Sequence, residues 1–492
     1  MKKTKFNRKR SIALILSMLL VMQQSFALQV LATEITNGNG TPITPNGGDN
    51  TWNITPDAVN GDVGFRQFGK INLSQGDILN FIYTYIKQQG VNVTWDESNQ
   101  THSVHLTNGA KGDIKTFINL VNDGVTINGI VNALQSAGGA LKNDGNLVFI
   151  SPNGFVVGAS GVLNVGNLSV VTPTQNSYDT LSRYLNLPQK SEGRLTNVTI
   201  TEHDPRTQGK YTLNKTFSDS VFVASDTDKT FNINTLTDGA GNLLVLGGNK
   251  IQIDAGGKVA ARGDISLQGG TVTNNGILLA GLGNNETTAL TGHEAANTLF
   301  TKLVNIDNLG TANTFVNNNG NITITSQKGT SIGNGALVRN YGKGNINITN
   351  SGNDGLLIAG EVSNPNGETR IVNAGGKLLV DTNGKILSGG SVNNESTFLM
   401  SNISNGGMDV QGKVKINHNK KVGSVNFINK NSDMKIGSAT NDKNIESNAN
   451  VIIAVDNGNL LNNGFAKTLI YTTNGADLDT IVTNGRIGDE VG

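Results

Sequence analysis

Histidine is the first residue type in this chain that could bind a metal. The chain has five histidines, and only His102 and His105 are close together in the sequence. Two imidazoles can contribute to a zinc site, but a separation of three places them on opposite faces of a strand. We therefore expect solvent-exposed strand residues at these positions, with no shared metal. The sequence also contains no His-Glu-x-x-His motif and no phosphate loop, and we predict no cofactor.

Carboxylates are the second group that could carry out chemistry. Glycoside-cleaving enzymes need paired acidic side chains at one site, whereas the aspartates of the glycine-rich part of this chain are spread singly. Most of them stand beside glycine or asparagine, where an aspartate is fully explained as a turn residue. The aspartates considered are Asp254, Asp264, Asp307 and Asp381. We predict that the chain is not an enzyme, and a polysaccharide-active enzyme remains the alternative.

A third group is the tripeptide Arg262-Gly263-Asp264. Some adhesins use Arg-Gly-Asp as an integrin ligand, so this tripeptide is a candidate for cell adhesion. The same residues also read as an ordinary corner, because Gly-Asp directly precedes the strand-forming run Ile265-Ser266-Leu267. Both interpretations stay open at the level of the sequence.

The elements that position these residues are short apolar runs separated by glycine and asparagine. The stretch Asn146–Pro173 contains four such runs, and Ser151-Pro152-Asn153-Gly154 separates the first two. Proline restricts one turn position, and Asn-Gly tolerates positive φ at the next. The four runs are Leu147–Ile150, Phe155–Val157, Val162–Val165 and Leu168–Val171. Such a pattern favours a chain that coils as a parallel solenoid over one that folds back in long hairpins.

Repetition later in the chain supports the same fold. Asn321–Ile324 is echoed by Asn345–Ile348 and Thr369–Val372, with first isoleucines at 322, 346 and 371, spacings of 24 and 25. Gly355–Ile358 and Lys377–Val380 are 22 positions apart. We predict an all-β fold, a right-handed parallel β-helix (solenoid) with an N-terminal cap and small extra-helical insertions. Isoleucine, valine and leucine should stack inside, and asparagine amides should stack at corners.

The same stretch carries a family resemblance. Pro152-Asn153-Gly154, Val157-Gly158 and Asn164-Val165-Gly166 with Leu168 resemble core motifs of the filamentous-haemagglutinin N-terminal domain, the two-partner secretion domain of large bacterial exoproteins. Ser151 stands where that family has asparagine, and a serine can make a similar local turn hydrogen bond. Further similar segments are Gly64–Phe68 with Ile71–Leu73, Phe117–Val121, in which Leu120 replaces an arginine, and Ile127–Val131.

The resemblance implies an exported filamentous adhesin or haemagglutinin. It also implies a partner, an outer-membrane β-barrel transporter whose periplasmic domains recognise the N-terminal domain, with folding outside the cell drawing the chain through. Recognition could use strand addition. We assign recognition to Asn119, Pro152, Asn153 and Gly154, which are also expected to form corners. The receptor on a host cell or other surface, protein or carbohydrate, is not encoded by any readable motif.

The N-terminus has the pattern of an export signal. Six basic residues between Lys2 and Arg10 precede the apolar run Ser11–Met22, and Val30-Leu31-Ala32 offers a cleavage site before Thr33. Cleavage after Ala27 and retention as a membrane anchor are the alternatives, although the run is short for a span of about 20 residues. Losing six basic residues changes the formal net charge from +1 to −5, so nucleic acid is not expected as a partner. No other long apolar segment follows, and we expect no membrane span in the mature chain.

Cysteine is absent from the chain. Passage through a narrow pore would forbid closed disulfide loops, and a solenoid stable without disulfides is the alternative explanation.

The expected organisation has four parts. Residues 1–32 are a signal peptide, 33–52 a flexible lead-in, 53–270 the secretion domain and 271–492 a β-helix repeat region at the start of a longer rod. An insertion spans about 173–238, with a short helix at Ser177–Leu187 and an extra sheet over Glu192–Asp228. A capping helix is expected at Ser74–Gln89 and a strand at Val91–Leu106.

The last residues, Ile487–Gly492, lack the pattern of a barrel strand, so we expect transport by a separate protein. A haemolysin or cytotoxin exported by the same route is the other alternative function.

Overall fold

The computed structural model describes residues 32–60, 62–96, 101–137, 140–184, 198–203, 210–215, 222–223, 245–283, 289–304, 320–389, 396–418, 423–463 and 469–489. The chain divides into two units, Met1–Thr33 and Glu34–Gly492, and every element named below belongs to the second. The expected signal peptide lies outside the described residues, apart from Ala32.

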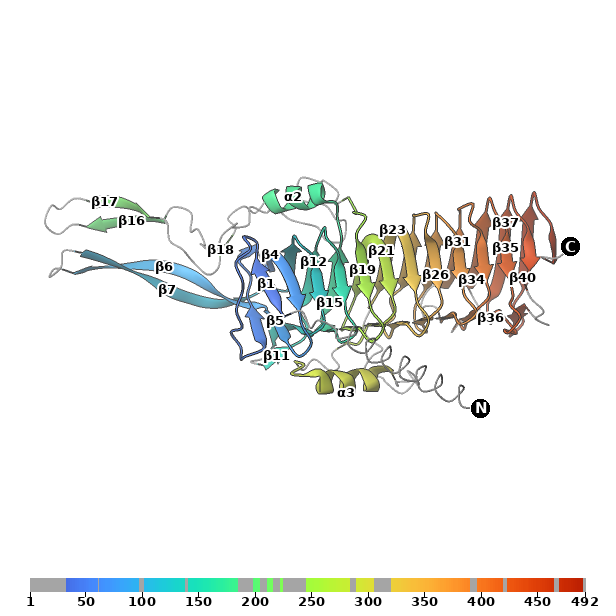
Figure 1. The fold of residues 1–492 in the computed structure, drawn as a ribbon, viewed down its shortest axis with the longest axis horizontal. Helices are drawn as coiled ribbons and strands as arrows, with labels where there is room; N and C mark the ends of the chain where they lie inside the picture. The colour runs from blue at the N-terminus through green and yellow to red at the C-terminus, as the bar shows by residue number, and fades with distance from the viewer. Residues whose placement is uncertain are drawn as a thin grey trace, which may run out of the picture. The chain divides into compact units, whose positions relative to one another are not determined.

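Strands dominate this unit, which confirms the all-β class. They form two large sheets, of 24 and 13 strands, in which nearly all pairings are parallel. The larger sheet holds two ladders side by side, and the smaller sheet is a third. Figure 1 shows the strands following one another along one axis in chain order.

Each ladder is defined by the strands that pair within it. The first consists of β4 (Val63–Leu73), β8 (Thr116–Val121), β12 (Asn146–Ile150), β15 (Asn167–Val171), β21 (Ile265–Asn274), β23 (Ile322–Ile332), β25 (Ile346–Asn350), β28 (Thr369–Asn373), β31 (Ser396–Asn402), β34 (Gly423–Lys430), β37 (Asn450–Asp456) and β40 (Leu478–Thr483). The second shares β4, β21 and β23 and adds β9 (Val125–Ile127), β13 (Phe155–Val157), β19 (Lys250–Ile253), β26 (Gly355–Ile358), β29 (Leu378–Val380), β32 (Met408–Val410), β35 (Met434–Ile436), β38 (Leu460–Asn462) and β41 (Ile487–Asp489). The third consists of β2 (Thr51–Ile54), β5 (Ile78–Ile82), β10 (Ile130–Ala137), β14 (Val162–Val165), β20 (Lys258–Ala261), β22 (Ile277–Ala280), β24 (Leu337–Asn340), β27 (Glu361–Asn364), β30 (Lys385–Ser388), β33 (Lys413–Ile416), β36 (Ile445–Ser447) and β39 (Ile470–Thr472).

The chain visits the three ladders in turn, and we call one visit to each a round, as in β25, β26 and β27. The predicted spacings agree in part with the observed register. Ile322 pairs with Ile346 and Leu356 with Leu378. The predicted alignment of Ile346 with Ile371 is wrong by two residues, because Ile348 is the partner of Ile371. The spacing in this round is therefore 23 residues, two fewer than the sequence pattern suggested.

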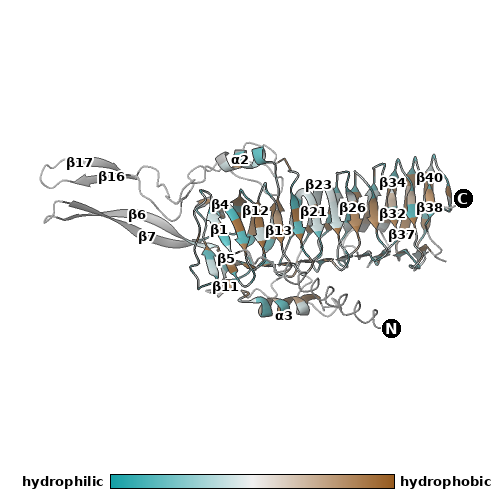
Figure 2. Ribbon diagram, in the orientation of Figure 1, coloured by the Kyte–Doolittle hydropathy of each residue, from teal (hydrophilic) through white to brown (hydrophobic). Residues whose placement is uncertain are grey.

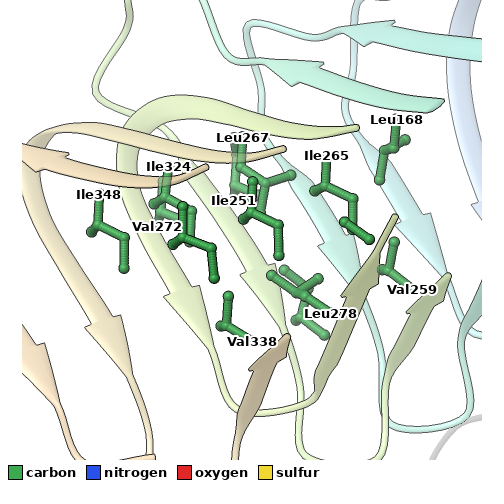
Figure 3. Close-up of a cluster of buried hydrophobic side chains, with 14 of the residues drawn as sticks. Leu168, Ile251, Val259, Ile265, Leu267, Val272, Leu278, Ile324, Val338 and Ile348 are labelled. Atoms are coloured by element: carbon green, nitrogen blue, oxygen red, sulfur yellow. The ribbon is translucent and has the colours of Figure 1, made fainter. Parts of the chain in front are cut away.

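Alternate side chains of most ladder strands point into one large hydrophobic core that the three ladders share. One inward column of the first ladder is a continuous stack in which every member is at most 1% exposed. Figure 3 shows side chains of the first two ladders, such as Leu267 and Val272, on the side of the core opposite Leu278 and Val338 of the third. In Figure 2 the hydrophobic residues lie along the stacked strands. The column contains Ile324, Ile348, Ile371, Met400, Phe427 and Ile453.

Asparagines stack at the corner that follows the first ladder, as predicted. Asn350 donates to Asn373, Asn373 to Asn402 and Asn402 to Asn429, each from Nδ2 to Oδ1 at 2.8 Å. All four side chains are 0% exposed. The amides therefore continue the hydrogen bonding of the strands into the corner, where the backbone turns away.

The N-terminal end differs from prediction. No helix forms at Ser74–Gln89; β5 and the start of β6 (Thr84–Asp96) occupy the segment. Ile78 to Ile82 alternate between half-buried and buried, a period of two that parallel pairing with β2 and β10 imposes. The end is covered instead by β1 (Glu34–Asn37), which pairs antiparallel with β4 inside the segment expected as a flexible lead-in. Ile35, 2% exposed, holds it against the core.

Several elements lie outside the three ladders. The predicted strand at Val91–Leu106 falls in two antiparallel strands, β6 and β7 (Thr101–Asp113). The predicted helix after Pro173 is confirmed as α2 (Gln175–Tyr184), with the Thr174 hydroxyl accepting from the Ser177 amide at its start. A second helix, α3 (His293–Val304), packs its apolar side on outward residues of the third ladder.

The remaining short strands complete the described structure. β16 (Val198–His203) and β17 (Lys210–Lys215) form an antiparallel pair within the segment predicted as an extra sheet. The others are β3 (Ala58–Asn60), β11 (Ala140–Lys142) and β18 (Phe222–Val223). Among the described residues, neither helix has the length and hydrophobicity needed to cross a membrane.

Candidate recognition site

The corner between β12 and β13 contains three of the four residues assigned to recognition. Gly154 has φ of 98° and lies over Gly124, whose φ is 96°. Both values fall in the left-handed region that favours glycine. The Val125 amide donates to the Gly154 carbonyl at 3.1 Å, so the two corners are joined by their backbones.

Close packing makes glycine necessary at both positions. A Cβ on Gly124 would be 3.1 Å from the Asn153 carbonyl oxygen, and a Cβ on Gly154 would be 3.1 Å from the Lys250 carbonyl oxygen. Three successive corners are therefore in contact through their main chains. Lys250 comes almost one hundred residues after Gly154 in the sequence. The Pro152–Gly154 corner therefore lies where the second ladder continues from β13 to β19, on either side of the insertion.

The side chains of this corner differ in exposure. Asn153 is exposed and donates from Nδ2 to the Asn122 carbonyl at 2.7 Å. Pro152 is buried, and its carbonyl accepts from Asn249 Nδ2. The expected turn hydrogen bond of Ser151 is wrong: this side chain is 0% exposed, and its hydroxyl has no hydrogen-bonding partner among the described residues.

Asn119 is the fourth assigned residue, and it is 0% exposed in β8. Its Nδ2 donates to the Val148 carbonyl of β12 at 3.1 Å, while Oδ1 has no partner in the described part of the chain. Asn119 pairs in register with Phe149, so it belongs to the round next to the Pro152–Gly154 corner. The structure thus brings the four residues into neighbouring rounds, but only Asn153 presents a side chain to solvent.

An ion pair lies beside Asn119. Arg66 is its register partner in β4 and contacts Asp57 at 3.1 Å. Burial raises the pKa of Asp57, and the Arg66 charge opposes that rise. Arg66 also donates to Asn37 Oδ1 at 3.0 Å, tying β1 to β4. This cluster holds the N-terminal end together.

Sequence reasoning missed two residues that build the site. Asn122 and Asn249 fasten the corner from the rounds on either side through the contacts given above. Each stands in a turn next to a strand, and the abundance of asparagine at such positions was the available signal.

The Arg-Gly-Asp tripeptide forms a corner before β21. Arg262 is 4% exposed and donates to Asn164 Oδ1. Asp264 Oδ1 accepts from the amide and Nδ2 of Asn321 at 2.7 and 3.0 Å. An Arg-Gly-Asp ligand presents both its guanidinium and its carboxylate to an integrin. Here the Arg262 side chain is buried.

The other candidates for chemistry are separate from one another. Asp254 and Asp381 lie in turns after β19 and β29, where each main-chain carbonyl accepts from a glycine amide, and Asp307 falls outside the described residues. His102 and His105 lie on β7, where their side chains are not described. Within the described ranges, no three metal-ligating side chains come together. No model of a known protein family matches this chain, and no curated protein was found to match it.

Proposed function

We propose that this chain is an exported filamentous adhesin of the two-partner secretion type, wound as a right-handed parallel β-helix. Three ladders visited in chain order support that winding. In this proposal the N-terminal rounds are recognised by the periplasmic domains of an outer-membrane β-barrel transporter, and the folded rod is presented at the cell surface or released.

The observation that carries the proposal is the corner at Pro152–Gly154. Its residues resemble the secretion-domain motif, its backbone is fixed by contact with the corners on both sides, and Asn153 is the exposed group. A rigid main chain with one polar side chain in solvent is suited to specific contact with a partner. Asn119 supports that contact indirectly. It donates to the Val148 carbonyl of β12, the buried strand that precedes the Pro152–Gly154 corner.

Folding supplies the direction of transport in this proposal. Each round that reaches the outside buries its inward side chains against the round before it, as in the column from Ile324 to Ile453. Removing that apolar surface from water is favourable, so a folded round resists return through a narrow pore. Strand pairing between neighbouring rounds allows this to proceed one round at a time.

An export assay in cells that also produce an outer-membrane transporter of the two-partner type tests the proposal. Asn153→Ala should reduce the amount of chain in the medium by about tenfold. The variant loses one hydrogen bond between uncharged groups at the interface with the transporter, and such a bond is worth about 1.4 kcal/mol. Thermal unfolding of the purified chain should change little, since Asn153 is exposed. The matched control is Asn334→Ala at the exposed corner Asn334-Gly335, where Gly335 also has positive φ.

Export of Asn153→Ala at the level of the parent would contradict the recognition role. Equal loss of export for Asn334→Ala would show instead that any altered corner impairs passage.

A further inference from the structure

Three stacked positions lie where the chain enters the second ladder in successive rounds. They are Lys377, Gly407 and Asp433, which directly precede β29, β32 and β35. The Leu378 amide donates to the Gly407 carbonyl at 2.9 Å and the Met408 amide to the Asp433 carbonyl at 3.1 Å, which sets the three positions in one column. Since neighbouring strands are about 4.8 Å apart, the main chains of Lys377 and Asp433 are separated by about 10 Å.

Gly407 leaves a gap in this column. Its φ of 82° lies in the left-handed region, which favours glycine at this turn. A Cβ at Gly407 would meet only the Asp433 carbonyl oxygen within 4 Å, at 3.0 Å, so the space above the glycine is otherwise open. The gap is a cavity of about 270 Å³ in the C-terminal half of the chain (Figure 1), lined by Lys377, Asn405–Asp409, Ser432, Asp433 and Lys435.

One wall of the cavity contains a buried ion pair. Lys377 Nζ contacts Asp409 Oδ2 at 2.9 Å, and the side chain of Asp409 is 4% exposed whereas that of Lys377 is 49% exposed. Gln411 donates to the same oxygen at 2.9 Å and Asn463 donates to Oδ1 at 3.1 Å. Both oxygens of Asp409 are therefore occupied, and this carboxylate holds the Lys377 ammonium in place. An ammonium carries three protons, so Lys377 has further donors to offer.

The opposite wall contributes an acceptor. Asp433 Oδ1 accepts from the amide and from Nδ2 of Asn459, both at 2.9 Å, which fixes the carboxylate. Asp433 Oδ2 receives no hydrogen bond from the residues that the structure describes. At the rim, Asn405 is exposed, and its side-chain amide likewise has no partner among them. An ammonium, an amide and a carboxylate thus border one small cavity.

The charge and size of the cavity favour a small neutral ligand with several hydroxyl groups. The lining holds two lysines and two aspartates, so their formal charges cancel, and any ion would be attracted by one pair and repelled by the other. A hydroxyl both donates and accepts, so hydroxyls on adjacent carbons can use the ammonium, the amide and the carboxylate together. The volume is just below the range of about 300–1,000 Å³ that holds drug-sized ligands, which suits a single sugar ring.

We propose that the cavity above Gly407 binds the terminal sugar of a neutral glycan. Lys377 donates to one ring hydroxyl, Asp433 Oδ2 accepts from another, and Asn405 closes the rim over the sugar. The site gives the proposed adhesin a class of receptor, and that biological role rests on the proposed function. No aromatic side chain in the described part of the chain lines the cavity. Binding therefore depends on hydrogen bonds, and we expect a Kd of about 1 mM.

Saturation-transfer NMR on the purified mature chain measures this binding directly. The neutral probes are methyl β-D-galactopyranoside, methyl α-D-mannopyranoside and the methyl β-glycoside of N-acetylglucosamine. The charged probes are methyl phosphate and choline. At least one of the neutral sugars should bind, and both charged probes should bind more weakly than that sugar.

Two substitutions remove ligand contacts while keeping the corners intact. Asp433→Asn keeps Oδ1 for Asn459 but replaces the free acceptor by a donor, and it should weaken sugar binding about tenfold. Asn405→Ala removes an exposed amide and should weaken binding about fivefold. The matched controls are Asn353→Ala and Asp354→Asn, at the exposed corner before β26 two rounds earlier. Both controls should bind as the parent does, and thermal unfolding checks that all four variants are folded.

Three results would overturn the site. They are failure of all three sugars to bind the parent, tighter binding of either charged probe, and unchanged sugar binding by both Asp433→Asn and Asn405→Ala. The proposed function fails by a different measurement, the export assay. Sugar binding that is lost in these two variants would uphold the site even if the chain were not exported through a transporter, and only its role in adhesion would then be removed.

Discussion

At the scale of single residues, His418 stands out as a buried imidazole. It follows β33 and is 5% exposed, and neither ring nitrogen has a hydrogen-bonding partner among the described residues. Burial lowers its pKa below the ordinary 6.5, because a charged imidazole would lose its hydration. The folded chain therefore keeps His418 neutral, whereas the unfolded chain takes up the proton at the ordinary pKa.

Stability should consequently fall in acid. The contribution of His418 is complete above the unfolded pKa of 6.5 and is lost as the pH falls below it toward the lower folded value. His418→Leu cannot take up the proton, so its free energy of unfolding should decline less than that of the parent between about pH 7.5 and about pH 5. Urea unfolding of both chains at the two pH values measures the difference.

Part of the acid sensitivity should persist in that variant. His293 also has a lowered pKa, caused first by burial and then by the charge of Lys258. Identical pH dependence of the parent and His418→Leu would show that His418 is solvated in solution.

At the scale of elements, α3 shows how a segment outside the three ladders is bound to them. Its first residue, His293, accepts from the Gly76 amide at 3.3 Å. At its last turn, Tyr341 donates to the Leu303 carbonyl, and Arg339 donates to the Val304 carbonyl at 3.2 Å. Free carbonyls at a helix C-terminus favour such donors, so the helix is held at both ends as well as by its apolar side.

The asparagine stack should contribute measurably to stability. Asn402→Ala leaves the Nδ2 of Asn373 and the Oδ1 of Asn429 without their 2.8 Å partners in a site closed to water. Unpaired buried polar groups cost about 1–3 kcal/mol each, and we expect a loss of about 3 kcal/mol in the free energy of unfolding by urea denaturation.

A surface pair provides the comparison for that variant. Asn417 is exposed and accepts from Asn448 Nδ2 at 3.0 Å, so Asn417→Ala should cost less than about 1 kcal/mol. Equal losses for the two variants would mean that the buried stack contributes no more than a surface contact.

At the scale of the whole unit, stability should be distributed locally along the stack. The strands of each round pair with those of the neighbouring rounds, so a defect in one round should weaken the adjoining rounds and leave distant ones unchanged. Phe427 tests this behaviour because it fills the inward column and lies 5.5 Å from Phe398, measured between ring centroids.

Phe427→Ala should cost about 3–5 kcal/mol through the cavity it creates. Hydrogen exchange followed by mass spectrometry should be faster in β31, β34 and β37, with the Pro152–Gly154 corner unaffected. Asn426→Ala changes the outward neighbour in the same strand and should leave exchange as in the parent. Faster exchange across all rounds would instead indicate a single cooperative unit.

The amino-acid sequence by itself determined the local pattern of this protein. Short apolar runs, glycine corners and repeats of about 22 to 25 residues predicted an all-β chain with parallel pairing, and the stacked asparagines followed from the same repeats. These features depend on residue types within one strand or one turn, where backbone preferences act directly.

Only the tertiary structure decided which strands became neighbours. Ile78, Leu79 and Ile82 fit a helical period as well as a strand, and pairing with β2 and β10 selected the strand. Phe155 pairs with Ile251 across the insertion, and Ile371 pairs with Ile348 and not with Ile346. Register between rounds depends on how many residues the connections consume, a quantity that strand propensity does not encode.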